Sequence, residues 1–139
     1  MEILYCTKTV GDNSYSDSII RWLSAEDYEV FRDHLLLCEQ RVLDRGEWNK
    51  AYESGTVYCG LFVGERMVAR ACVEKYSFNA WEVADVRTAK QYRGNGYAGQ
   101  VCSFVLDYII GHGKTATIRT EEDNIKMQRV IAKLDFSVL

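Results

Sequence analysis

The chain has 139 residues, the length of one domain, of which 47% are hydrophobic and 27% are charged. This composition can bury a core and excludes an intrinsically disordered chain. The formal net charge of -3 and the isoelectric point of about 5.4 argue against general nucleic-acid binding, which usually requires a basic face.

The first part of the chain predicts two strands and two helices. We expect an edge strand at 1–10, a polar loop at 11–17 and a second strand at 18–23. Two helices follow, at about 28–43 and at 47–54. Residues 24–27 resemble a capping box at the start of the first helix, and Gly46 is expected to break that helix. The first segment includes Glu2 and Lys8 and lacks a long apolar run, so it predicts neither a signal peptide nor a membrane span.

The second part of the chain predicts a hairpin, a central strand and two helix–strand pairs. In order, we expect strands at 57–63, 67–73 and 81–88, a helix at 97–111, a strand at 115–120, a helix capped by Asp123 or Asn124 that runs to 134, and a strand at 136–139. This order predicts an α/β sandwich built around one mixed sheet.

Residues 91–98, Gln-Tyr-Arg-Gly-Asn-Gly-Tyr-Ala, form a glycine loop between a predicted strand and a predicted helix. The two glycines let the backbone turn sharply and approach a ligand closely. The first amides of the helix lack intrahelical partners, and the helix dipole adds positive charge there. Arg87, Lys90 and Arg93 crowd the same loop, so it predicts a site for a phosphorylated ligand. The alternative is a plain left-handed turn into a helix; neither a dinucleotide fingerprint nor a Walker loop is present.

Two motifs stand at a separation that is more specific than either motif alone. The first is Gln91-Tyr92-Arg93-Gly94-Asn95-Gly96, and the second opens at Asn124 and ends in Lys133-Leu134-Asp135-Phe136. Together they resemble the GCN5-related N-acetyltransferase (GNAT) family, whose motifs are Gln/Arg-x-x-Gly-x-Gly/Ala and a helix that ends in Lys-Leu-Gly-Phe. The similarity spans roughly residues 19–136. It implies one domain over 1–139 of the α/β (α+β) class, with a central mixed, mostly antiparallel sheet flanked by helices on both faces.

The resemblance implies acetyl-CoA as cosubstrate and no metal. Amides of residues 93–98 would hold the pyrophosphate, and the backbone of Val86 and Thr88 would pair with the pantetheine arm like an added strand. A peptide N–H near Val86 would polarise the thioester carbonyl. Asn124 would bond the CoA arm, cap its helix, or both. The implied cofactor-binding residues are Val86, Arg87, Thr88, Gln91, Arg93, Gly94, Asn95, Gly96, Tyr97, Ala98 and Asn124.

Three positions depart from the family pattern. Lys90 stands where the family often has Pro, and Asp135 stands where it has Gly, so Asp135 is expected to be left-handed. Ile131 occupies the position of the family's usual general acid, a Tyr, and cannot protonate a leaving thiolate. Water or another Tyr would have to do so.

Glu82 and Asp85 are the candidate catalytic carboxylates, with Glu82 first. Either could deprotonate an ammonium, directly or through water, and the alternative is a solvated or ion-paired carboxylate. Because they are three residues apart in a strand, they are expected to face opposite sides of the sheet. Trp48 and Tyr52, one helical turn apart, could line the acceptor pocket or belong to the core.

Two functions fit these patterns. The first is acetyl transfer from acetyl-CoA to a primary amine of a small molecule or peptide, which Glu82 and Asp85 favour. The second is a non-catalytic acyl-CoA-binding sensor or interaction module, which Ile131 favours. The cysteines show no CxxC spacing and the two histidines have no second ligand, so we expect a cytoplasmic protein with reduced thiols and no metal. No nucleic-acid or membrane partner is expected, and a homodimer is left open.

Overall fold

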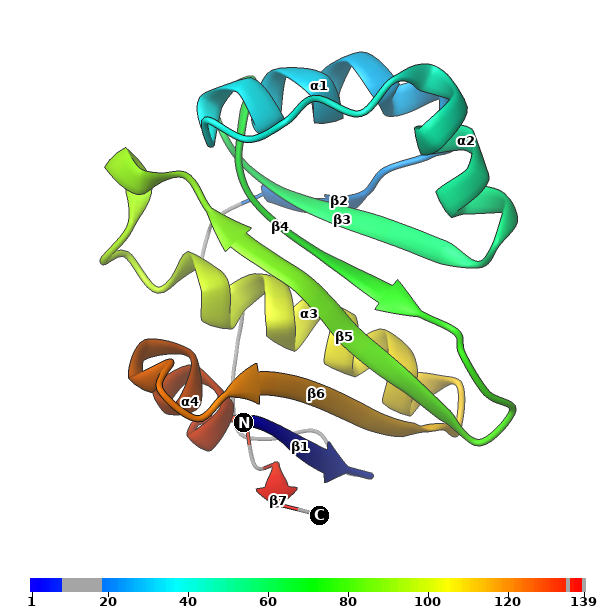
Figure 1. Ribbon diagram of the computed structural model, residues 1–139, viewed down its shortest axis with the longest axis vertical. Helices are drawn as coiled ribbons and strands as arrows, with labels where there is room; N and C mark the ends of the chain where they lie inside the picture. Colours follow the sequence, from blue (N-terminus) through cyan, green and yellow to red (C-terminus); the bar gives the residue numbers. More distant parts are fainter. Residues whose placement is uncertain (9–18, 135, 139) are drawn as a thin grey trace.

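The computed structural model describes residues 1–8, 19–134 and 136–138 (Figure 1). The strands are β1 Glu2–Thr7, β2 Ile19–Trp22, β3 Thr56–Val63, β4 Arg66–Glu74, β5 Ala80–Thr88, β6 Thr115–Glu121 and β7 Ser137–Val138. The α-helices are α1 Tyr28–Leu37, α2 Arg45–Glu53, α3 Tyr97–Gly111 and α4 Ile125–Ala132, and the short 3-10 helices are Ala25–Asp27 and Lys90–Tyr92. The loop predicted at 11–17, the start of the strand predicted at 18, the conformation predicted for Asp135 and the final residue lie outside the described residues.

The strands form one seven-stranded sheet in the order β2-β3-β4-β5-β6-β1-β7. Only β5 and β6 are parallel, and the other neighbours are antiparallel, so the predicted mixed, mostly antiparallel sheet is confirmed. The prediction that the first strand is an edge is wrong, because β1 pairs with β6 on one side and β7 on the other. Alternating side chains identify a strand but carry no information about its neighbours.

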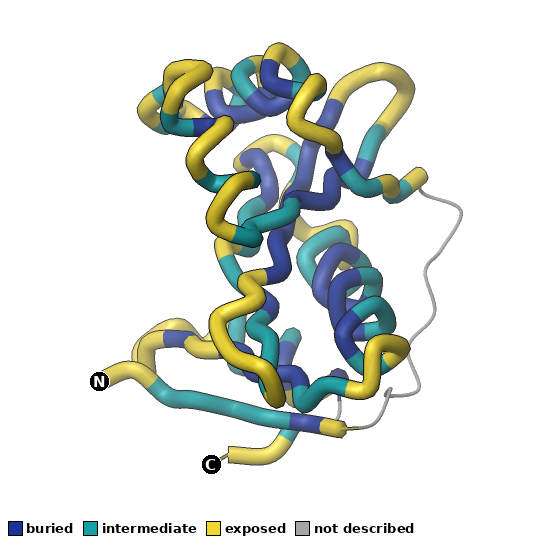
Figure 2. The backbone as a smooth tube through the Cα atoms, turned by 90° about the vertical axis from the view of Figure 1, so that its right-hand side faces the viewer, coloured by how far each residue is buried: buried dark blue, intermediate teal, exposed yellow. Residues whose placement is uncertain are grey.

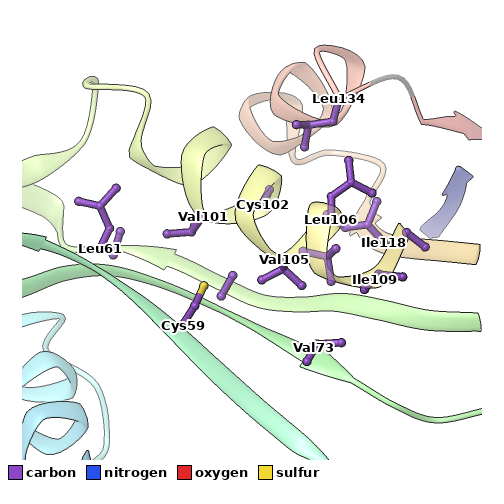
Figure 3. Packing of buried hydrophobic residues seen from close by; sticks show 14 of the residues in the cluster. Cys59, Leu61, Val73, Val101, Cys102, Val105, Leu106, Ile109, Ile118 and Leu134 are labelled. Atoms are coloured by element: carbon purple, nitrogen blue, oxygen red, sulfur yellow. The ribbon is translucent and has the colours of Figure 1, made fainter. Parts of the chain in front are cut away.

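The helices cover both faces of the sheet, as predicted (Figure 1). On one face α1 packs on β4 and α2 packs on β3, around a core that includes Phe31 and Trp48. On the other face α3 packs across β3 to β6, and α4 packs against α3 and β6. Val101, Val105 and Ile109, spaced one helical turn apart, line the inner side of α3 in this main core (Figure 3). The buried positions concentrate in the central strands and along α3 (Figure 2).

Both predicted helices at 28–54 differ from the observed ones. The first ends at Leu37 rather than near 43, because Glu39 adopts a left-handed φ of 58° and the N–H of Gln40 returns to the Leu35 carbonyl at 3.0 Å. Gly46 does not break a helix but lies in the first turn of α2. A capping box formed by Asp44 and Glu47 begins that helix, and it outweighs the cost of about 1 kcal/mol for a helical Gly.

A bulge in β5 overturns the prediction that Glu82 and Asp85 face opposite ways. Cys72 pairs with Ala84 but Arg70 pairs with Arg87, so two residues of β5 stand opposite one of β4. Asp85, the first of these two, has a left-handed φ of 48°. An extra residue reverses the alternation of side chains, so Asp85 lies on the face of Glu82, the one covered in part by α1 and α2.

The cysteines of the described residues are mostly buried. The side chains of Cys38, Cys59, Cys72 and Cys102 are buried and Cys6 is partly buried, all as free thiols. In the described part of the chain, no helix is long and apolar enough to cross a membrane.

Candidate functional site

The site begins where β5 and β6 separate. The two strands pair only from Ala80 with Thr115 to Val83 with Ile118, and beyond that point they spread apart (Figure 1). A cavity of about 480 Å³ lies beside the C-terminal end of β5, bordered by the glycine loop, the start of α3 and one side of α4. Its lining residues are Val86, Arg87, Thr88, Tyr92, Arg93, Gly94, Gly96, Tyr97, Ala98, Gly99, Asn124, Lys126, Met127 and Val130.

The glycine loop has the backbone conformation that its sequence predicts. Gly94 and Gly96 have left-handed φ values of 85° and 78°. Within the described residues, a Cβ at either position would meet no atom within 4 Å, so φ rather than space calls for Gly. Gly96 is the N-cap of α3 and provides no side-chain cap. Because the first four amides of a helix lack intrahelical partners, the start of α3 presents N–H donors to the cavity.

Two side chains stiffen the loop. The Asn95 side-chain amide donates to the Tyr92 carbonyl at 3.0 Å, and Arg93 Nε donates to the Thr88 carbonyl at 3.0 Å. Asn95 and the exposed Gln91 do not line the cavity, so the structure does not bring these two predicted residues to it. The other nine predicted cofactor-binding residues line it.

Two residues that line the cavity each carry a buried polar atom that is unsatisfied. Arg87 Nε and Thr88 Oγ1 have no hydrogen-bond partner among the described residues, and both residues line the cavity. Buried polar groups in native proteins are nearly always paired, so such atoms call for an explanation. The open helix amides and the strand edge at the cavity fit a ligand with phosphate and amide groups, such as CoA.

Helix α4 forms the far wall. Asn124 Oδ1 accepts from the Met127 N–H at 3.1 Å, which confirms the helix cap, and Asn124 also lines the cavity. Met127 and Val130 line the cavity, whereas Ile131 is fully buried in the main core. The sequence predicts all three on one apolar stripe, and only packing divides them. Position 131 is therefore directed into the core instead of toward a ligand.

Five lining residues are not among those predicted from the sequence. Gly99 and Lys126 follow the two helix starts, and Tyr92 lies inside the first motif, so their proximity to the predicted site was a usable signal. Met127 and Val130 gave no such signal, because apolar residues at helical spacing usually indicate core.

Both candidate carboxylates are ion-paired. Glu82 Oε1 accepts from Arg119 Nε at 2.9 Å and from Thr117 Oγ1 at 3.2 Å, and its side chain is 12% exposed. Asp85 accepts from Arg70 Nη2 at 2.9 Å and from the Tyr58 hydroxyl at 2.6 Å, with a side chain 43% exposed. The same face carries a third carboxylate, Glu74, the cross-strand partner of Glu82. Burial, and then the charges of Glu82 and Asp85, raise the pKa of Glu74.

Trp48 does not line a pocket. Its side chain is fully buried in the core under α1 and α2, and its Nε1 donates to the Ala25 carbonyl at 2.8 Å. Tyr52 packs against it, and the Tyr52 hydroxyl donates to the Leu23 carbonyl at 2.8 Å and accepts from the Tyr58 N–H at 3.2 Å. Neither residue borders the cavity, so the predicted acceptor pocket is corrected to a packed core.

Within the described residues, no group of three His, Cys, Asp or Glu side chains could hold a metal ion.

The sequence profile of the acetyltransferase (GNAT) family matches residues 16–136. The chain belongs to this family. Solved structures of the family share the fold of this chain. One is an acetyltransferase from Novosphingobium aromaticivorans, with 22% identity and a TM-score of 0.74. The alignment covers 99% of this chain and 60% of that one. One from Colwellia psychrerythraea has 18% identity and a TM-score of 0.76, aligned over 99% of this chain and 52% of its own. No curated protein sequence matches significantly.

A third solved structure has a similar length to this chain. AAC(6')-Iy, in complex with the bisubstrate analog CoA-S-monomethyl-acetylneamine, has 16% identity and a TM-score of 0.71, aligned over 88% of this chain and 92% of its own. The first two relatives are longer, so this GNAT domain corresponds to between half and three-fifths of their chains.

Proposed function

We propose that this GNAT domain transfers an acetyl group from acetyl-CoA to a primary amine by direct attack of the amine. The observation that carries the proposal is the cavity between the start of α3 and the C-terminal end of β5, where β5 no longer pairs with β6. It combines a strand edge with open helix amides, which are contacts that a CoA thioester needs.

The chain's own groups divide the binding task. The amides that follow Gly94 and Gly96 hold pyrophosphate, and Lys126 adds positive charge at the same cavity. The backbone of Val86 and Thr88 pairs with the pantetheine arm, with Met127 and Val130 as the apolar wall. A peptide N–H near Val86 stabilises the charge that develops on the thioester oxygen.

The two proton transfers fall to opposite sides of β5: the amine loses its proton on the face away from the cavity, and the leaving thiolate gains one on the cavity side. Glu82 is the proposed base, acting directly or through water. Its carboxylate lies on the face of the sheet where α1 and α2 pack on β4 and β3 and leave β5 and β6 uncovered. The leaving thiolate takes its proton from water or from Tyr92 or Tyr97, the two phenols that line the cavity. Ile131 has no part in this step, because it is buried in the main core.

The acceptor is proposed to be a small-molecule amine, with a peptide amine as the alternative. The support is the similarity to AAC(6')-Iy, whose bound analog joins CoA to an acetylated aminoglycoside fragment. A second function, acyl-CoA binding without turnover, is favoured by one observation: the position of the family's usual acid is committed to the core.

A panel of amines with acetyl-CoA, followed by release of free thiol, tests the first function. Calorimetric titration with CoA, run in parallel, tests the cavity assignment. We expect binding together with turnover of at least one amine. Binding without turnover across small amines and lysine-containing peptides would support the sensor, and absence of CoA binding would overturn both functions.

A further inference from the structure

Arg70 is a buried cation in the middle of β4. Its side chain is 4% exposed, yet its guanidinium is bonded on all sides. Nη2 and Nε donate to Asp85 at 2.9 and 3.3 Å, and Nη1 donates to Gln40 Oε1 at 2.8 Å and to His34 Nε2 at 3.1 Å. Burial of a charge is costly unless it is paired and hydrogen-bonded, so these contacts are what allow Arg70 to occupy this position.

The contacts of Arg70 and Asp85 tie α1, the segment after it and β3 to β5. His34 lies on α1, Gln40 follows that helix, and Tyr58 on β3 donates its hydroxyl to the same Asp85 carboxylate at 2.6 Å. His34 Nδ1 lies 3.1 Å from the Met67 carbonyl, which can only accept. Nδ1 therefore carries the hydrogen and Nε2 accepts from Arg70. Burial and the charge of Arg70 lower the pKa of His34 to about 4, which keeps the ring neutral in this role.

Asp85, the residue that Arg70 and Tyr58 hold, is the left-handed residue of the β5 bulge. A residue with a Cβ is strained in this conformation, and such strain persists where the surroundings over-determine it. Asp85 immediately precedes Val86 to Thr88, whose backbone forms the strand edge at the cavity. The direction of these peptide groups therefore depends on the conformation at Asp85.

We infer that Arg70 is a positioning residue, which with His34, Gln40 and Tyr58 holds Asp85 in the left-handed bulge and so orients the strand edge of the acyl-CoA site. The inference rests on the proposed function. It assigns Asp85 a backbone role, in which the carboxylate serves as the anchor for Arg70 and does not accept the proton of the amine.

Two substitutions at one position separate the backbone role from the carboxylate role. Asp85→Gly and Asp85→Ala both remove the carboxylate and both leave Arg70 without it. They differ in that Gly enters the left-handed region freely and Ala does not. We expect kcat of the Gly variant to exceed that of the Ala variant by roughly 5- to 30-fold. The Gly variant should also bind CoA more tightly than the Ala variant. The pH profile of kcat should keep its wild-type shape in both.

Matched controls use Glu39→Gly and Arg70→Gln. Glu39 is the other described non-glycine residue with positive φ, at 58°, and its replacement should leave kcat and CoA affinity unchanged. Arg70→Gln should resemble Asp85→Ala, by weakening the anchor while the carboxylate remains. Equal loss in Asp85→Gly and Asp85→Ala, with loss of the acidic limb of the pH profile, would make Asp85 the base and overturn the inference.

Failure of the proposed function is distinguishable from failure of this inference. If the wild-type domain binds CoA but turns over no amine, acetyl transfer fails, and the order of CoA dissociation constants for the Gly and Ala variants still decides the role of the bulge. Equal dissociation constants for wild type, Asp85→Ala and Arg70→Gln would show that the bulge does not orient the edge.

Discussion

The glycine loop and the β5 bulge, both beside the cavity, contain residues with left-handed φ, and the two conformations are maintained by different means. Gly94 and Gly96 reach φ values of 85° and 78° without a Cβ, and nothing described would touch one if it were added. Asp85 reaches a φ of 48° with a Cβ, and its carboxylate is bonded to Arg70 and Tyr58. The loop conformation follows from residue type, whereas the bulge conformation follows from contacts with α1, β3 and β4.

This difference predicts separate responses to perturbation. A change in the glycine loop should act on ligand binding and leave the fold intact, because few contacts depend on the loop. A change in the Arg70 network should act on stability and on the strand edge together, because the same bonds serve both.

The largest expected effect is on the bulge. Arg70→Met removes the hydrogen bonds to Asp85, His34 and Gln40, and should lower the free energy of unfolding by about 3 kcal/mol in urea denaturation. Arg119→Met is the matched control, because the Arg119 side chain is 43% exposed whereas that of Arg70 is 4% exposed, and its loss should cost about 1 kcal/mol or less. Equal small losses in both variants would mean that the buried network does not hold the bulge.

The same network should make stability depend on pH. The pKa of His34 is lowered to about 4 from 6.5, by burial and by Arg70. Below pH 6.5 the unfolded chain binds a proton that the folded chain does not, so stability falls from pH 6.5 to 4 by about 3 kcal/mol. His34→Gln should flatten this part of the curve, measured by urea denaturation at several pH values. An unchanged slope in the variant would exclude His34 as its source.

The glycine loop should respond in binding alone. Gly96→Val forces a β-branched residue to a φ of 78° beside the amides of α3, and should weaken CoA binding by about 100-fold or more in calorimetry. Gly111→Ala is the control, because its φ is ordinary and a Cβ there meets nothing described within 4 Å. Normal affinity in Gly96→Val would remove the loop from the proposed site.

The smallest effect should appear at Glu82. Its two hydrogen bonds, from Arg119 and Thr117, must loosen before it accepts a proton, so Glu82→Gln should lower kcat about tenfold at neutral pH. CoA affinity should stay near wild type, and the rate should recover in part at high pH, where the amine is already neutral. A variant with the wild-type rate at pH 7 would indicate deprotonation by solvent.

Features set by neighbouring residues in the chain could be predicted from the sequence. The three central strands, the start of α3 and the cap at Asn124 depend on alternation, on glycine and on a side chain that reaches its own backbone. Nine of the eleven predicted cofactor-binding residues accordingly line the cavity, counted from Val86 to Asn124 without Gln91 and Asn95.

By itself the sequence determined the order of elements, the glycine loop and, through two motifs, the GNAT family. Only the tertiary structure decided that Asp85 and Glu82 share a face, that Trp48 and Ile131 are core, and that β1 lies inside the sheet. The physical reason is the distance along the chain over which each kind of interaction acts. Periodicity and caps act over a few residues, whereas a bulge, a strand neighbour or a buried Arg70 depends on register and packing between distant segments.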